Sequence, residues 1–205
     1  MSIIQVLRIV RAAAVLFLLS GAVSALVGCN ARPAFHNLDI TGNTQFASDF
    51  ALPDANGKIR TLADYKNKVV VLFFGYMHCP DVCPTTMAEL AQTMQQLGAD
   101  AANRVQVLFV TLDPQRDTAN LLTQYVQAFN PSFIGLRPDD VQLKKVAESF
   151  HVYYAKTPGK TPGSYTMDHT AASYVFDSTG KLRLFVRDGQ GVTPWVHDLQ
   201  LLLNG

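Results

Sequence analysis

Residues 68–76 restrict the possible folds of this chain most strongly, because nearly every side chain in the segment is aliphatic or aromatic. A strand with one exposed face alternates apolar and polar residues, and this segment does not alternate. Continuous apolarity is typical of a strand covered on both faces, as in the parallel sheets of α/β proteins. Residues 104–112, which are mostly apolar, are a second candidate for a buried strand. Together the two segments predict an α/β fold built on a central sheet with parallel strands.

The rest of the chain alternates between helix and strand patterns. Helices are expected over residues 85–97, from Asp117 or Thr118 to 129, from Asp139 or Asp140 onward, and from Thr193 toward the C-terminus. Strands are expected over residues 133–136, 152–156, 171–177 and 181–187, and a hairpin over residues 50–62 around Asp54-Ala55-Asn56-Gly57. This order predicts a thioredoxin-like α/β sandwich over residues 46–205, with an N-terminal β-hairpin extension.

The N-terminus has the pattern of a targeting segment. Arg8 and Arg11 precede an apolar run that ends at residue 28, and no acidic residue occurs before Asp39. Residues 1–28 therefore predict a signal peptide or a membrane anchor, and residues 29–45 a linker. The segment before Cys29 resembles a bacterial lipobox, which would make Cys29 the lipidated residue, and a plain transmembrane anchor is the alternative. In both cases we expect a membrane-anchored domain on the periplasmic or extracytoplasmic side of a bacterial cell envelope.

The charge of the chain argues against one class of partner. Its 205 residues carry a formal net charge of only +1. A general nucleic-acid binder needs a basic surface that displaces counterions from phosphates. We therefore expect no nucleic-acid partner.

Cys79 and Cys83 are the cysteines that remain if Cys29 carries a lipid. A disulfide between them would close a loop of three residues and would stabilise the fold little, because the gain grows with loop length. The pair follows a predicted strand and precedes a predicted helix, as in thioredoxin-like redox sites. The N-terminus of a helix favours a thiolate, and we expect Cys83, directly before Pro84, to be the better placed of the two.

His169 is the strongest candidate for a third ligand. It precedes the predicted strand at residue 171, and the loop that enters this strand of a thioredoxin-like sheet lies beside the cysteine pair. Two cysteines and one histidine make a soft ligand set that suits copper in either valence. Several other residues have simpler roles in packing, turns, helix capping or on the surface: His36, His78, Asp81, Asp113, Arg116, Asp117, His151, Met167, Asp168 and His197.

Three segments in order carry a resemblance to a known family: FGYMHCPDVCP at residues 74–84, DPQRDT at residues 113–118 and DHT at residues 168–170. Residues 46–204 resemble the SCO/SenC family, whose members are membrane-tethered thioredoxin-fold proteins that assist copper insertion into cytochrome c oxidase. The resemblance implies copper ligands at Cys79, Cys83 and His169. It also implies that subunit II of the oxidase, which holds the CuA centre, is a partner.

The leading functional hypothesis is a copper metallochaperone that takes Cu(I) or Cu(II) from a copper donor and assists assembly of the CuA centre. The alternative is a thiol-disulfide oxidoreductase in which Cys79 and Cys83 keep the cysteines of the oxidase site reduced. A peroxiredoxin-like peroxidase is a weaker third hypothesis, because it has no use for the second cysteine or for His169.

Overall fold

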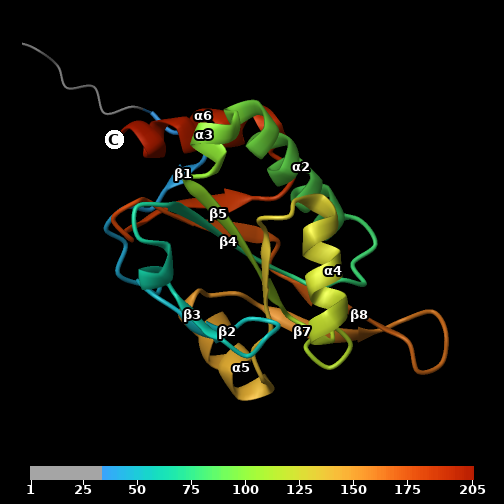
Figure 1. Ribbon diagram of the computed structural model, residues 1–205. Helices are drawn as coiled ribbons and strands as arrows, with labels where there is room; N and C mark the ends of the chain where they lie inside the picture. Colours follow the sequence, from blue (N-terminus) through green and yellow to red (C-terminus); the bar gives the residue numbers. More distant parts are fainter. Residues whose placement is uncertain (1–33) are drawn as a thin grey trace, which may run out of the picture. The chain divides into compact units, whose positions relative to one another are not determined.

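A computed structural model describes residues 34–205 (Figure 1). The predicted signal or anchor over residues 1–28 and the candidate lipidation site Cys29 lie outside the described residues. Within residues 34–205, no helix is both long enough and apolar enough to span a membrane.

A six-stranded mixed sheet forms the centre of the fold, in the order β1-β10-β9-β4-β5-β6. Its parallel half consists of β4 (Val69–Gly75), β5 (Val105–Thr111) and β6 (Ile134–Leu136). The other half, β9 (Ala172–Phe176), β10 (Leu182–Arg187) and β1 (Leu38–Asp39), is joined by antiparallel pairing. Every residue of β4 and of β5 is buried, as the continuous apolar segments predict.

Helices cover both faces of this sheet. Alternate residues of β4 point to opposite sides, so Val71 and Phe73 belong to one hydrophobic core and Leu72 and Phe74 to the other. The first core is closed by α2 (Val82–Leu97), α4 (Ala119–Phe129) and α6 (Val192–Asn204), and the second by α5 (Asp140–Ser149) and the 3₁₀ helix η1 (Leu62–Tyr65). A short helix, α3 (Ala99–Ala102), follows α2.

The start of α2 differs from the expectation. The helix begins at Val82 instead of residue 85, so Cys83 and Pro84 both lie in its first turn. Proline is tolerated there because the first N–H groups of a helix have no partner within the helix. The cysteine that was expected just before the helix is therefore part of it.

Two small hairpins flank the main sheet. In the first, β2 (Ala51–Pro53) pairs with β3 (Ile59–Thr61), and the Asp54 carboxylate accepts hydrogen bonds from the backbone of the intervening turn. In the second, β7 (Tyr154–Pro158) pairs with β8 (Tyr165–His169), and the loop between them projects from the body of the domain (Figure 1). The sequence did not predict β8 as a strand.

Part of the expected linker over residues 29–45 is folded onto the domain. Leu38 and Asp39 form β1, and the backbone N–H groups of His36 and Asn37 donate to the carboxylate of Asp198 in α6. The segment is attached through backbone pairing at the edge of the sheet and through backbone N–H groups, which a hydropathy pattern does not reveal.

Candidate functional site

Cys79, Cys83 and His169 come from three different elements and meet at one place. Cys79 lies in the turn after β4, Cys83 in the first turn of α2, and His169 at the end of β8. One donor atom from each residue lies within 4.8 Å of the others. The Cys83 Sγ is 3.7 Å from the His169 Nε2, and both cysteines are free thiols. The arrangement can hold a metal ion or support thiol exchange, and which of the three residues are ligands stays a prediction.

The two thiols have opposite acidities. The Cys79 sulfur accepts hydrogen bonds from the Cys83 thiol and from the backbone N–H of Cys83, and its pKa is lowered to about 5. Cys83 is fully buried, and both donation to the Cys79 sulfur and burial raise its pKa. At neutral pH the pair therefore holds one proton, on Cys83. The expectation that Cys83 is the better placed thiolate is wrong, because the backbone N–H and the thiol of Cys83 both donate to the Cys79 sulfur, which lies outside the first turn.

The imidazole of His169 is held in one orientation. Its Nδ1 lies 3.0 Å from the carbonyl oxygen of Thr170. A carbonyl only accepts hydrogen bonds, so Nδ1 carries a proton, and Nε2 is the ring nitrogen that faces Cys83. The ring also packs edge to face against Tyr76, with centroids 5.7 Å apart. A neutral imidazole with a free Nε2 is the form that binds metals.

Gly75 allows the close approach of Cys83 to the sheet. A Cβ atom at residue 75 would lie 2.9 Å from the Cys83 Sγ and 3.0 Å from the Phe109 ring. Sequence reasoning did not identify this residue. The available signal was a glycine at the end of a fully buried strand, where close backbone approach is a common reason for its presence.

Asp117 supports the turn that carries Cys79. Its side chain is fully buried, and one oxygen accepts from the Met77 backbone N–H at 3.1 Å and from the Thr111 hydroxyl at 2.6 Å. Its other oxygen lies 3.7 Å from Nδ1 of the half-exposed His78 ring. Burial raises the pKa of Asp117. The turn-and-cap role expected for this residue is incomplete, because its carboxylate also connects β5 to the cysteine segment.

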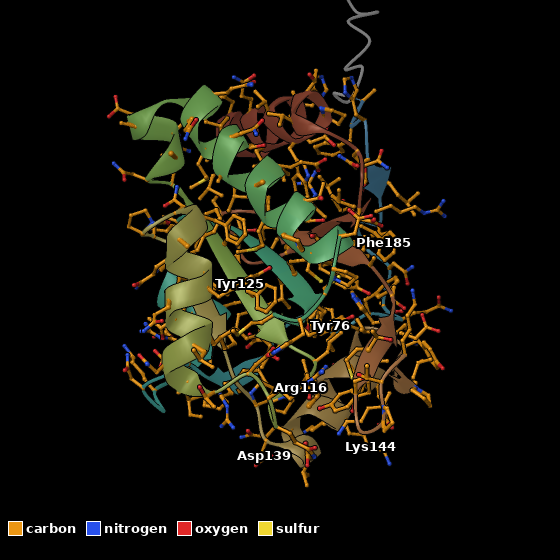
Figure 2. All side chains as sticks on the ribbon, turned by 90° about the vertical axis from the view of Figure 1, so that its right-hand side faces the viewer. Tyr76, Arg116, Tyr125, Asp139, Lys144 and Phe185 are labelled. Carbon is orange, nitrogen blue, oxygen red and sulfur yellow. The ribbon has the colours of Figure 1, made fainter. Side chains whose placement is uncertain are left out.

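Asp113, Arg116 and Tyr165 form a cluster that attaches β8 to the loop after β5. Arg116 donates to Asp113 and to the Tyr165 carbonyl, and its guanidinium lies 3.6 Å from the centre of the Tyr165 ring. The Tyr165 hydroxyl donates to Asp113 at 2.9 Å. Figure 2 shows Arg116 and Tyr76 on the face that also carries α4 and the β7–β8 hairpin. Because β8 ends at His169, this cluster helps to position the histidine.

The remaining candidates have ordinary surroundings. Met167 is buried in the first core, and the side chains of Asp81 and Asp168 are exposed. The His151 ring lies 2.8 Å from the Gln45 carbonyl oxygen. Among the residues that the structure describes, none of these four side chains belongs to the group of Cys79, Cys83 and His169.

The fold is thioredoxin-like and places a free cysteine pair at the start of a helix, opposite a histidine. Together these features define a thiol-based redox or metal-binding protein. The family model described as SCO1/SenC matches residues 39–204. The chain therefore belongs to the SCO1/SenC family, as the sequence motifs predict.

Individual relatives agree with this assignment. The bovine (Bos taurus) mitochondrial SCO2 homolog is 40% identical over 133 residues, which cover 64% of this chain and 50% of that protein. The solution structure of apo Sco1 from Thermus thermophilus has a TM-score of 0.72 and 37% identity, covering 84% of this chain and 99% of the other. The structure of Bradyrhizobium japonicum ScoI with copper bound has a TM-score of 0.65 and 38% identity, covering 76% and 98%. The chain thus spans half the length of the bovine relative.

Proposed function

We propose that the chain is a copper metallochaperone that binds one copper ion through Cys79, Cys83 and His169 and assists assembly of the CuA centre of cytochrome c oxidase. The observation that carries the proposal is the convergence of two sulfurs and a free Nε2 within 4.8 Å. The donor chemistry fits the metal, since thiolates favour Cu(I) and imidazole is suited to copper. Its relative ScoI from Bradyrhizobium japonicum was solved with copper bound, which supports the same cargo here.

The protonation states define how the site takes up its cargo. Cys79 is already a thiolate at neutral pH, whereas Cys83 must lose a proton to become a ligand. Copper uptake by the reduced site therefore releases about one proton per ion at neutral pH. Release to a partner then proceeds by exchange of these ligands for those of the recipient, which we propose to be subunit II of the oxidase, after loading by a copper donor.

The location completes this proposal. We propose that residues 1–28 are a signal peptide or membrane anchor, with Cys29 as the lipidation candidate, and that the domain lies on the periplasmic or extracytoplasmic side of a bacterial cell envelope. Metabolic labelling with a radioactive fatty acid tests the lipid. Label that is lost in a Cys29→Ala variant supports a lipid anchor, and an unlabelled protein that remains in the membrane fraction supports a transmembrane anchor.

Copper titration of the reduced protein tests the ligand set. The wild type is expected to bind one equivalent with a thiolate-to-copper charge-transfer band, and His169→Ala to lose at least tenfold in affinity, in line with the loss of a direct ligand. His151→Asn is the matched control, because it removes an exposed imidazole that contacts Gln45 and Phe46 and does not belong to the cysteine and histidine group. An unchanged affinity in His169→Ala would remove the histidine from the ligand set.

A thiol-disulfide oxidoreductase is the second candidate, and the acidity of Cys79 favours it. The Cys79 thiolate attacks one sulfur of a target disulfide, forms a mixed disulfide and releases the other target sulfur as a thiolate. Cys83 then loses its proton and attacks the Cys79 sulfur, which forms the Cys79–Cys83 disulfide and frees the second target thiol. The target is reduced by two electrons and the pair is oxidised by two.

The His169→Ala variant separates the two candidates. A chaperone requires the imidazole, whereas disulfide exchange uses only the two sulfurs. CuA assembly that fails in His169→Ala, while exchange with a disulfide substrate continues, supports the chaperone. CuA assembly that continues in His169→Ala but fails in Cys79→Ser supports the reductase.

A further inference from the structure

A second group of metal-ligating side chains lies where the N-terminal segment meets α6. Donor atoms of His36, His197 and Asp198 are within 4.8 Å of one another. The two imidazole rings are stacked, with centroids 3.9 Å apart and planes inclined by 5°. These residues take no part in the proposed copper site, and from the sequence we expected only surface or structural roles for the two histidines.

The carboxylate of Asp198 organises this group. One oxygen accepts from the His36 backbone N–H at 2.9 Å and lies 2.8 Å from the His197 Nδ1, and the other accepts from the Asn37 backbone and side chain, each at 2.9 Å. Burial alone would raise the pKa of Asp198, but these hydrogen bonds outweigh it and the pKa is lowered. The carboxylate is therefore ionised at neutral pH, and it fixes the backbone of one histidine and the ring of the other.

The hydrogen bond to Asp198 determines which nitrogen of His197 is free. An ionised carboxylate only accepts, so Nδ1 of His197 donates and Nε2 carries the lone pair. Metal-binding histidines in proteins are usually oriented in this way, with the second ring nitrogen donating to a carboxylate or a carbonyl. The arrangement prepares His197 as a ligand before any ion arrives.

His36 can adjust its ring to share an ion with His197. Two nitrogens that each bind at about 2.0–2.1 Å must lie within about 4 Å of each other. The His36 residue is exposed, so its ring can turn out of the stack while its backbone N–H stays bonded to Asp198. Arg187, which lines the hollow beside His36, opposes a cation, and the ionised Asp198 offsets that charge.

We propose that His36 and His197 form a second metal site, separate from the cysteines, which binds a divalent ion of the Cu(II) and Zn(II) class with Asp198 as the positioning carboxylate and water in the remaining positions. Two imidazoles without a thiolate suit these borderline ions and do not select Cu(I). The general order of affinities for divalent ions predicts tighter binding of Cu(II) than of Zn(II). The site does not depend on the proposed function, because it shares no residue with it.

The test uses the full chain, kept in detergent, with Cys29→Ala, Cys79→Ser and Cys83→Ser to remove all three thiols. The variant is titrated with a Cu(II)–glycine complex and separately with zinc sulfate, and metal per chain is counted by elemental analysis after desalting. One equivalent is expected to remain, with nitrogen couplings in the electron paramagnetic resonance spectrum of Cu(II). Adding His36→Ala or His197→Ala should weaken binding at least tenfold, and adding His151→Asn should leave it unchanged.

His36→Ala is the decisive variant, because it keeps the backbone bond to Asp198 and removes only an exposed ring. If metal binding is retained in this variant, or if the thiol-free chain binds no metal, the stacked pair only attaches the N-terminal segment to α6 and the proposal is overturned. Failure of the proposed function gives a different result. In that case the His169→Ala variant, with its cysteines intact, would bind copper with the affinity of the wild type.

Discussion

Cys79 and Cys83 differ in the hydrogen bonds that their sulfur atoms make, and this difference assigns them separate chemical roles. The Cys79 sulfur receives the N–H of Cys83 and the Cys83 thiol, whereas Cys83 is buried against β4 where Gly75 leaves room for its sulfur. Under either proposed function, Cys79 would therefore attack a disulfide or capture an ion first. Cys83 would complete the disulfide or the metal site after it loses its proton.

The reactivity of Cys79 should follow its lowered pKa. Alkylation by iodoacetamide needs the thiolate, so the rate for Cys79 is expected to rise as the pH increases through about 5 and then to level off. Mass spectrometry of the modified peptide measures the rate at each pH. Cys79→Ser is the control, and the remaining Cys83 should react slowly at neutral pH. A midpoint near the ordinary thiol pKa would contradict the assigned roles.

Replacement of Gly75 tests the packing behind Cys83. Gly75→Ala introduces a Cβ 2.9 Å from the Cys83 sulfur, and overpacking of this kind costs about 1–3 kcal/mol. Chemical denaturation measures the change in the free energy of unfolding. The cost should shrink in a Cys83→Ala background, because one of the two crowded atoms is gone. Equal costs in the two backgrounds would show that Cys83 does not fill this space.

The elements that the sequence predicted well are those whose pattern depends on burial. Residues 68–76 are almost continuously apolar and residues 104–112 are mostly apolar, and the strands within them, β4 and β5, are fully buried. The sequence analysis missed β8 because the strand is short: Thr166 and Asp168 share its exposed face, and only Tyr165, Met167 and His169 lie on the other. The three motifs predicted which side chains come together, but not that the lowered pKa would belong to Cys79. That outcome depends on where the first turn of α2 begins, a boundary that Pro84 obscured.

The cluster of Asp113, Arg116 and Tyr165 connects the element that carries His169 to the main sheet. Arg116→Met removes the cation beside the buried Asp113, so a loss of about 3 kcal/mol in stability is expected. Tyr165→Phe removes one hydroxyl but keeps the ring under the guanidinium, and should cost only about 1 kcal/mol.

Hydrogen exchange distinguishes a positioning role from a general loss of stability. Arg116→Met should speed exchange at the backbone amides of β8 more than at those of β10, and should weaken copper binding by the reduced protein. Arg116→Lys should restore only part of both effects, because an ammonium group cannot make the forked contacts of the guanidinium. If hydrogen exchange became faster to the same extent across the whole sheet while copper binding stayed normal, the positioning role would be rejected.

At the scale of the whole molecule, two regions far from each other in sequence depend on buried carboxylates. Asp117 attaches the cysteine turn to β5, and Asp198 attaches the segment before β1 to α6. Hydropathy patterns did not reveal either connection, because each consists of one polar side chain that accepts backbone N–H groups across the fold. The domain start at residue 46, predicted from composition, therefore omits residues that take part in the sheet.

Truncation should show that the segment before residue 46 belongs to the stable domain. A chain that begins at Phe46 lacks three hydrogen bonds to Asp198, two from backbone N–H groups and one from the Asn37 side chain. Hydrogen bonds to a charged group contribute about 1.5–3 kcal/mol each, and Asp198 would keep His197 as a partner. We expect a loss of at least about 3 kcal/mol relative to a chain that begins at Phe35, measured by chemical denaturation. The control is Asn37→Ala in the longer chain, which should lose about 1–2 kcal/mol because only the side-chain bond is removed. Equal free energies of unfolding for the two chain lengths would make the segment a linker after all.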